Sequence, residues 1–495
     1  MACRMRHVLM GTGDTANIAV AHIISCRKFQ FPQVTSAAYL RLKSPSFLSA
    51  VSSFAKREEL FPGVRTKLHL QNRICRLVAS SFSSSSSAAN SSMDATVQKK
   101  LVLLPVANDT EEMEAVILAD VLRRAGADVT LASVENDLQI LASRKVKLVA
   151  DTNISLCEGH KYDLIVLPGG MPGAARLRDS ATLQKLVEAQ AKEKRPFAAV
   201  CAAPAVALET WGLLQGLKAT CHPSFTERLT NKEAVDNRVV RDGLATTSRG
   251  PGTSIEFALS LVEQLFGKDK MEEIAKALIV LPPNVTPAAE EYNPTEWKGK
   301  DGFRVLVPIA NGSEDIESVV IIDVLRRAGF DVVVASVEKD LQVVASGKVK
   351  IVADTLIGDV ASSDFDAIVL PGGIPGAETL HRCSTLTKLL QKQLESKRII
   401  AAICASPAVV LEAGGFLKGK KATAYPRFTK DLSDQSAIDA RVVIDGLVIT
   451  SRGPGTTMEF ALSIVEKVLG FEKVASMAEA MVLPYSKILV KQAVH

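Results

Sequence analysis

Phe197-Ala-Ala-Val-Cys201-Ala-Ala-Pro204 is a run of small and β-branched apolar residues that contains one cysteine and leads into a helical pattern. The chain repeats it as Ile400-Ala-Ala-Ile-Cys404-Ala-Ser-Pro407. This pattern is typical of a buried parallel strand that turns sharply into a helix and holds one side chain above the sheet edge. A cysteine at such a turn lies near a helix N-terminus, which favours the thiolate. Most buried cysteines are nevertheless inert small hydrophobes.

Strands and helices alternate around each of these cysteines. In the first half we predict strands over 101–107, 128–133, 163–167 and 218–221, and a hairpin about Asp242-Gly243. A shorter strand over 145–150 is expected at a sheet edge. Helices are predicted over 111–125, from about residue 182, and after the loop 246–252. This alternation predicts an α/β fold with a doubly wound, mainly parallel sheet and helices on both faces.

The same order of elements occurs twice. Glu114 and Glu317 lie 203 positions apart, as do Gly169 and Gly372, and also Cys201 and Cys404. A constant offset of this kind indicates a tandem duplication. We therefore predict a first domain over 98–282, a linker over 283–300, a second domain over 301–485 and a C-terminal tail over 486–495.

The segment 1–95 differs in composition from the rest of the chain. It is rich in Arg and Ser, contains few acidic residues and ends in a Ser-rich run over 80–92. These features are typical of a disordered transit peptide. The Ser-rich end favours a chloroplast, and the Arg content leaves a mitochondrion open. Translation from Met93 would give a cytosolic protein, and a disordered tail or translated leader is the simpler alternative.

Composition excludes several classes of function. The net charge of +5 arises largely in the N-terminal segment, so the folded part has no basic stripe for nucleic acid. No apolar run approaches the roughly 18 residues of a membrane span. The eight cysteines form no CxxC pair, which makes a disulfide framework unlikely. The seven histidines are scattered, so we expect no metal site.

Three features should meet outside the carboxyl ends of the strands. They are Glu114 after the first strand, the pair Gly169-Gly170, and Cys201. If Glu114 turns toward Cys201, the two acidic groups would share one proton. The glycine amides and the N–H of Ala202 could form an oxyanion hole. The alternatives are that Glu114, like Glu111 and Glu112, only complements the helix dipole, and that the glycines form only a tight turn.

A histidine follows the predicted strand over 218–221. His222 near Cys201 could carry protons, although a lone histidine is more often structural. The second half has Tyr425 at the same position, and tyrosine is a poor proton shuttle at neutral pH.

Five motifs, each present twice, resemble the ThiJ/PfpI superfamily. In the first half they read Glu-Glu-Met-Glu114, Val-Leu-Arg-Arg-Ala-Gly126, Val-Leu-Pro-Gly-Gly170, Ala-Ala-Val-Cys201-Ala and Thr-Ser-Arg-Gly-Pro-Gly-Thr253. They are most similar to its DJ-one subgroup, which includes a parkinsonism-associated protein and plant tandem-domain relatives. The resemblance covers about 98–282 and 301–485. It implies two flavodoxin-like α/β sandwich domains, each with a reactive cysteine on the elbow.

The resemblance also implies an activity. It points to glutathione-independent conversion of methylglyoxal and glyoxal to lactate and glycolate, with no metal or redox cofactor. By motif position it implies as catalytic residues Cys201, Glu114, His222, Cys404 and Glu317, and as oxyanion donors Gly170, Ala202, Gly373 and Ala405. Other roles credited to the family are redox sensing, chaperone-like behaviour and protein deglycation. The superfamily's Cys-His-Glu hydrolases need a histidine directly after the cysteine or a His/Glu pair late in the domain, whereas here Ala202 and Ala405 follow the cysteines and no late histidine exists.

Family members pair as homodimers, in which each site takes arginines from the partner. The resemblance therefore implies that the two copies pair as an internal pseudodimer, with further oligomerisation open. The borrowed anion-binding positions match Arg124 and Arg144 in the first copy, and Arg327 and Gly347 in the second. The Cys404 site would then receive both arginines but lack the histidine. We expect two specialised sites, with the first the better glyoxalase.

Overall fold

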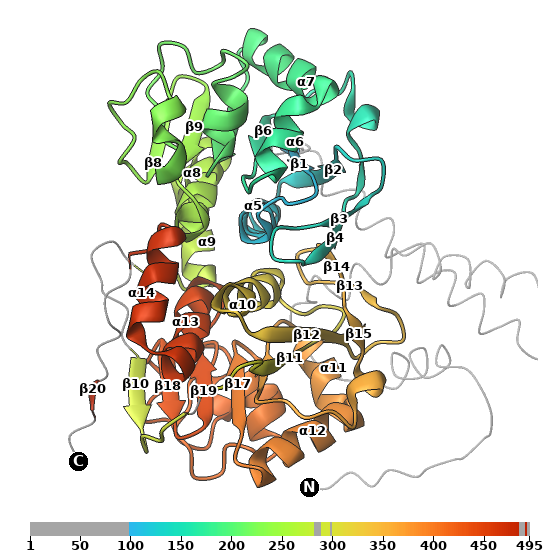
Figure 1. Cartoon of the computed structure of the whole chain (residues 1–495), viewed down its shortest axis with the longest axis vertical. Helices are drawn as coiled ribbons and strands as arrows, with labels where there is room; N and C mark the ends of the chain where they lie inside the picture. The colour runs from blue at the N-terminus through green and yellow to red at the C-terminus, as the bar shows by residue number, and fades with distance from the viewer. Residues whose placement is uncertain (1–98, 282–288, 298, 485–490, 493–495) are drawn as a thin grey trace, which may run out of the picture. The chain divides into compact units, whose positions relative to one another are not determined.

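The computed structural model describes residues 99–281, 289–297, 299–484 and 491–492. Figure 1 shows two α/β repeats, each with a central sheet flanked by helices. The predicted transit peptide lies outside the described residues, as does most of the predicted tail. No helix in the described part has both the length and the apolar character needed to cross a membrane.

The first repeat has a seven-stranded sheet in the order β5-β2-β1-β6-β7-β9-β8. All neighbours are parallel except the hairpin β8–β9. The strands are β1 (Leu101–Val106), β2 (Asp128–Ser133), β5 (Thr152–Asn153), β6 (Leu164–Leu167), β7 (Phe197–Val200), β8 (Val239–Asp242) and β9 (Ala245–Ser248). The helices are α5 (Glu112–Arg124), α6 (Gly173–Asp179), α7 (Ala181–Lys192), α8 (Ser254–Phe266) and α9 (Lys268–Leu278), with short turns η1 (Ile154–Cys157), η2 (Pro204–Leu208), η3 (Pro223–Arg228) and η4 (Pro251–Thr253).

The second repeat has the same order with two strands added at one edge, β15-β12-β11-β16-β17-β19-β18-β10-β20. The strands are β10 (Ala289–Tyr292), β11 (Arg304–Ile309), β12 (Asp331–Ser336), β15 (Thr355–Leu356), β16 (Ala367–Leu370), β17 (Ile399–Ile403), β18 (Val442–Asp445), β19 (Val448–Ser451) and β20 (Lys491–Gln492). The helices are α10 (Asp315–Ala328), α11 (Gly376–Arg382), α12 (Ser384–Glu395), α13 (Thr457–Leu469) and α14 (Phe471–Ala480), with short turns η5 (Ile357–Val360), η6 (Pro407–Glu412), η7 (Thr429–Asp431) and η8 (Pro454–Thr456). The predicted fold class is confirmed.

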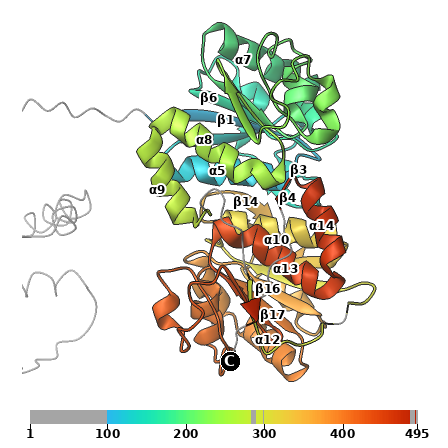
Figure 2. The same ribbon diagram turned by 90° about the vertical axis from the view of Figure 1, so that its left-hand side faces the viewer.

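Helices α5 and α10 lie at the boundary between the repeats and pack against each other (Figure 2). Every residue of α5 from Glu112 to Leu122 is buried. A helix on the surface of a single domain has one exposed polar face. Burial around the whole circumference therefore requires cover from the other repeat, as well as from the helix's own sheet and from α8.

A small antiparallel sheet also joins the repeats. Its order is β13-β14-β4-β3, with β3 (Gln139–Leu141) and β4 (Lys147–Val149) from the first repeat and β13 (Gln342–Val344) and β14 (Lys350–Val352) from the second. Strand β4 pairs with β14 across the boundary, Leu148 opposite Ile351. The predicted strand over 145–150 therefore exists, but its expected place at an edge is wrong, because β14 covers it.

Two further expectations differ from the structure. Residues 218–221 form no strand, because Thr220 donates its backbone N–H to the Thr247 hydroxyl at 2.9 Å instead of joining a ladder. The predicted linker contains β10, which pairs in parallel with β18. Trp297, from the same segment, also packs at this edge of the sheet. It is 7% exposed and donates its indole N–H to the Gly446 carbonyl at 2.9 Å.

Trp297→Phe should therefore lower the free energy of unfolding by about 1–3 kcal/mol, because it leaves the Gly446 carbonyl without its buried donor. Urea unfolding followed by circular dichroism measures the change. Trp211→Phe is the matched control, since Trp211 is only half-buried and donates to the Arg178 carbonyl at 3.2 Å. An unchanged unfolding curve for Trp297→Phe would contradict this account of the linker.

Candidate active site

Each cysteine lies directly after a central strand of its sheet. Cys201 follows β7 and Cys404 follows β17, and both have a left-handed backbone with φ of 65°. Such a conformation costs a non-glycine residue on the order of 1–3 kcal/mol and persists only where the surroundings enforce it. Here the Cys201 N–H donates to Ser248 O at 3.0 Å, and its carbonyl accepts from His222 N at 2.8 Å. The sharp elbow predicted from the sequence is present in both repeats.

The glycine pair after β6 lies against the cysteine. A side chain at Gly169 would place its Cβ 2.5 Å from Cys201 Cβ and 3.0 Å from Ala202 N, so only glycine fits there. The Gly169 N–H donates to Glu114 Oε2 at 2.7 Å, and the Gly170 N–H points to the Cys201 sulfur. Gly372 and Gly373 do the same for Glu317 and Cys404. Of the predicted oxyanion donors, Gly170 and Gly373 thus face the thiol, and Ala202 and Ala405 follow it directly.

Glu114 lies beside Cys201 in a fully buried position. Its Oε1 atom has no nitrogen or oxygen partner in the described part of the chain and is free to meet the thiol. Burial raises the pKa of Glu114 to about 7, against the opposing effects of the Gly169 amide and the Cys201 thiol. Glu317 repeats this arrangement at Cys404, and its pKa is likewise raised to about 7 by burial. The role of a mere complement to the helix dipole does not account for these positions.

The state of the thiol differs from the sequence-based expectation. Burial raises the pKa of Cys201 well above its usual value, and the charge of Glu114 raises it further, against the Gly170 N–H. The thiolate that the helix terminus was expected to favour is thus disfavoured while Glu114 is ionised. A proton on Glu114 removes that repulsion. Thiol and carboxyl therefore titrate as one coupled pair: Glu114 ionises before Cys201, and a thiolate forms with least repulsion when the proton has moved from the thiol to Glu114.

Each carboxyl is held in place by the opposite repeat. Arg327 donates to Glu111 Oε1 across the boundary, and Glu111 Oε2 accepts the backbone N–H of Glu114 at 2.8 Å. The same arrangement occurs in the second repeat, where Arg124 donates to Glu314 at 2.6 Å, and Glu314 accepts the N–H of Glu317 at 2.6 Å. We predicted substrate-binding roles for Arg124 and Arg327. In the structure these two arginines bind the carboxylates of Glu111 and Glu314, which in turn hold the backbone next to each cysteine.

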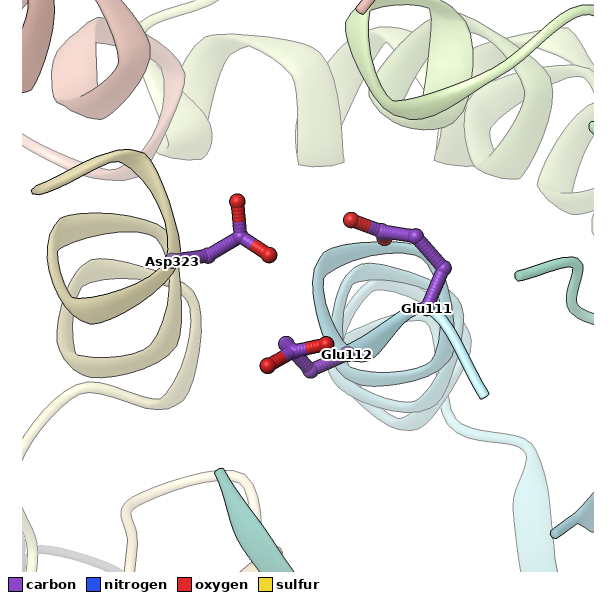
Figure 3. A group of neighbouring side chains, drawn as sticks. All are labelled: Glu111, Glu112 and Asp323. Atoms are coloured by element: carbon purple, nitrogen blue, oxygen red, sulfur yellow. The ribbon is translucent and has the colours of Figure 1, made fainter. Parts of the chain in front are cut away.

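Three buried carboxyl groups gather at this boundary. Oxygen atoms of Glu111, Glu112 and Asp323 lie within 4.8 Å of one another, and Figure 3 shows Asp323 facing the start of α5. A cation could fit such a donor set. Arg327 already supplies positive charge by donating to both Glu111 and Asp323. Burial, together with the nearby charge of Asp323, raises the pKa of Glu112 to about 7.

The remaining arginine prediction concerns Arg144 and its counterpart Gly347. The backbone N–H of Arg144 donates to Glu112 at 2.8 Å, and its carbonyl accepts from Arg326 at 2.9 Å. Its side chain is exposed. The structure therefore does not bring the Arg144 guanidinium to either thiol by a hydrogen bond. Gly347 makes the matching backbone contacts with Asp315 and Arg123.

His222 is fixed by backbone groups. Its Nδ1 accepts from Ser224 N at 3.2 Å, so Nε2 carries the proton and donates to Ala480 O of the other repeat at 3.2 Å. Tyr425 occupies the same place and donates its hydroxyl to Ala277 O at 3.1 Å. Both side chains thus bind the end of the opposite repeat's last helix. In the described chain the His222 imidazole makes no hydrogen bond to the Cys201 sulfur.

Sequence reasoning missed Glu111, Glu314, Asp120 and Asp323 as parts of the site. All four are buried. Their positions recur at the offset of 203, and this was the available signal. Helix termini commonly carry acidic residues, so the pattern alone could not separate buried carboxyls from exposed ones.

The raised pKa of Glu114 predicts a pH-dependent stability. A carboxyl with a raised folded-state pKa stabilises the protein below its unfolded value of 4.5, and this contribution is lost as the pH rises through about 7. Between pH 5 and pH 8 the wild type should therefore lose about 2–3 kcal/mol of unfolding free energy relative to Glu114→Gln. Urea unfolding at both pH values tests this, with exposed Glu188→Gln as the control. Parallel profiles for wild type and Glu114→Gln would contradict it.

Comparison with known proteins agrees with this arrangement. A model of the DJ-1/PfpI family matches residues 100–264 and again 303–467. Protein DJ-1 homolog B of Arabidopsis thaliana is 51% identical over 383 residues, which is 77% of this chain and 87% of the relative. Protein DJ-1 homolog A of the same plant is 50% identical over 384 residues, which is 77% of this chain and 98% of the relative.

A third relative carries a more specific name. The "Glutathione-independent glyoxalase DJR-1.2" of Caenorhabditis elegans is 38% identical over 181 residues, which is 36% of this chain and 95% of the relative. The two family matches cover both repeats and include both cysteines and both glutamates of the site. This chain therefore belongs to the DJ-1/PfpI family, and it contains the family domain twice in tandem.

Proposed function

We propose that this protein is a glutathione-independent glyoxalase, which converts methylglyoxal to lactate and glyoxal to glycolate. The observation that carries the proposal is the buried pair of Cys201 and Glu114, with the Gly170 N–H directed at the sulfur. The pair combines a nucleophile, a carboxyl whose pKa lies near neutrality, and a donor for a developing oxyanion. The glyoxalase name of the nematode relative supports the same reaction.

The chemistry requires only the substrate, water and these groups. The Cys201 thiolate adds to the aldehyde carbon of methylglyoxal, and Glu114 gives its proton to the oxygen, forming a hemithioacetal. Glu114 then removes the hydrogen from the former aldehyde carbon as a proton, which gives an enediolate. Return of that proton to the neighbouring carbon, together with transfer of the hydroxyl proton from the first oxygen to the second, gives a thioester of lactate. Water hydrolyses the thioester, releases lactate and restores the thiol, with no net change of oxidation state.

Loss of the nucleophile is the first test. Cys201→Ser should abolish most lactate formation from methylglyoxal in the absence of glutathione and added metal, because the serine hydroxyl is not ionised near neutral pH. Cys404→Ser is the matched variant and should retain most activity. The readout is lactate by enzymatic assay or NMR. Greater damage from Cys404→Ser would contradict the assignment of the main site. Absence of lactate from the wild type would remove the glyoxalase proposal and favour an oxidant-sensing thiol.

The difference between the repeats provides a second test. His222→Tyr introduces the residue of the second repeat, and a tyrosine hydroxyl already bonds a helix-end carbonyl at that position. If His222 moves protons during turnover, His222→Tyr should lower kcat at the Cys201 site roughly 10- to 100-fold. Tyr425→His, measured in a Cys201→Ser background, should raise the activity of the Cys404 site. Unchanged kcat in both variants would assign His222 to structure alone.

A further inference from the structure

A cavity of about 710 Å³ lies at the boundary between the repeats. Its lining includes neither Cys201 nor Cys404, nor their neighbours in the sequence. One wall is the end of α5 and the start of β2, with Arg123 and Arg124. The other wall is the β13–β14 hairpin of the second repeat, with Gly347, Lys348 and Lys350. Its volume falls in the range of small-molecule sites. Nothing in the proposed glyoxalase reaction uses it.

The cavity depends on residues that the duplication did not keep equal. At the offset of 203, Ala127 corresponds to Phe330, Lys99 to Gly302, and Gly347 to Arg144. Phe330 is a large side chain, and its ring lies 4.7 Å from the Phe303 ring. At the quasi-equivalent place Phe330 is larger than Ala127 and Gly302 lacks the charge of Lys99, whereas Arg144 adds a guanidinium where the cavity has Gly347.

The position of the backbone at Gly347 follows from the length of the acidic side chain that binds it. The hairpin amide at this position binds Asp315, whereas the quasi-equivalent amide of Arg144 binds the longer Glu112. Asp315 draws the hairpin inward, so that a Cβ at Gly347 would lie 2.3 Å from Asp120 Oδ1 and 3.0 Å from Asp315 Oδ2. Aspartate and glycine thus fit each other as a pair. The Arg124 side chain is 30% exposed, compared with 13% for its counterpart Arg327.

Positive charge prevails in the lining. The ammonium groups of Lys99 and Lys348, which both line the cavity, have no hydrogen-bond or ion-pair partner among the described residues. Arg123 and Lys350 share a single carboxylate, Asp151, at 3.0 Å each. These four side chains leave an excess of cations over carboxylates.

The remaining charged groups do not cancel this excess. Arg124 binds Asp120 and Glu314. Burial raises the pKa of Asp120, against the opposing effect of Arg124. The Asp120 Oδ1 atom is buried, has no hydrogen-bond partner in the part of the chain that the structure describes, and lies behind Gly347. Asp128 and Asp151 are the exposed acidic residues of the lining.

We propose that this cavity binds a small, doubly charged oxyanion of the phosphate-monoester type. Lys99 and Lys348 would neutralise the two charges, and the exposed edge of Arg124 would donate to an oxygen atom. The rest of the cavity gives room for a short organic group on the phosphate.

Isothermal titration calorimetry of the full chain with inorganic phosphate at low ionic strength tests the proposal. The wild type should bind one equivalent of phosphate, and acetate at matched ionic strength should give at least 10-fold weaker binding. Lys348→Gln should weaken phosphate binding about 5- to 10-fold. Lys145→Gln is the matched control at the quasi-equivalent hairpin position and should leave binding unchanged.

A second variant closes the cavity without changing charge. Ala127→Phe introduces the residue of the other repeat and should abolish phosphate binding, with circular dichroism confirming an unchanged fold. Three results would overturn the proposal. They are no phosphate binding by the wild type, equal weakening by Lys145→Gln and Lys348→Gln, and equal affinity for acetate.

Discussion

The buried ion pairs between the repeats constrain the rest of this structure. Arg327 reaches Glu111, Arg124 reaches Glu314, and each glutamate then holds the backbone of the carboxyl residue beside a cysteine. A buried carboxylate without a partner is costly, and removing one member of such a pair is strongly destabilising. Neither repeat can satisfy these groups alone. The two α/β units are therefore parts of one site-forming structure.

Burial of helices α5 and α10 follows from the same requirement. Both helices carry acidic residues in their first turn and arginines in their last turn. Packed side by side, the end of each helix brings its arginine to the start of the other. The apolar residues between them form the contact, and the charges fix its register. This arrangement explains why helices with buried glutamates and aspartates are stable at the centre of the molecule.

Fusion of two copies in one chain also removes a restriction. In a symmetric homodimer every substitution appears twice at the interface. Here each half changes independently, and it has done so at His222 and Tyr425, at Glu112 and Asp315, and at Arg144 and Gly347. The last two differences compensate each other, because a shorter carboxyl requires a residue without a side chain opposite it. The cysteine, glutamate and glycine of the site remain equal in both halves.

The sequence by itself determined the fold class, the duplication and the elbow cysteines. Periodic apolar strands and a constant offset of 203 are local properties of the chain, and they need no knowledge of contacts. The partnership of Glu114 with Cys201 was also predicted, because both follow parallel strands that end at one edge. Only the tertiary structure decided the protonation of this pair, since the raised pKa values depend on burial. It alone showed that β4 joins the two repeats, that part of the linker is a strand, and that the arginines bind carboxylates. Those outcomes depend on which surfaces of the two repeats pack together. Contacts across such an interface produce no periodic pattern in the sequence, so the sequence alone does not predict them.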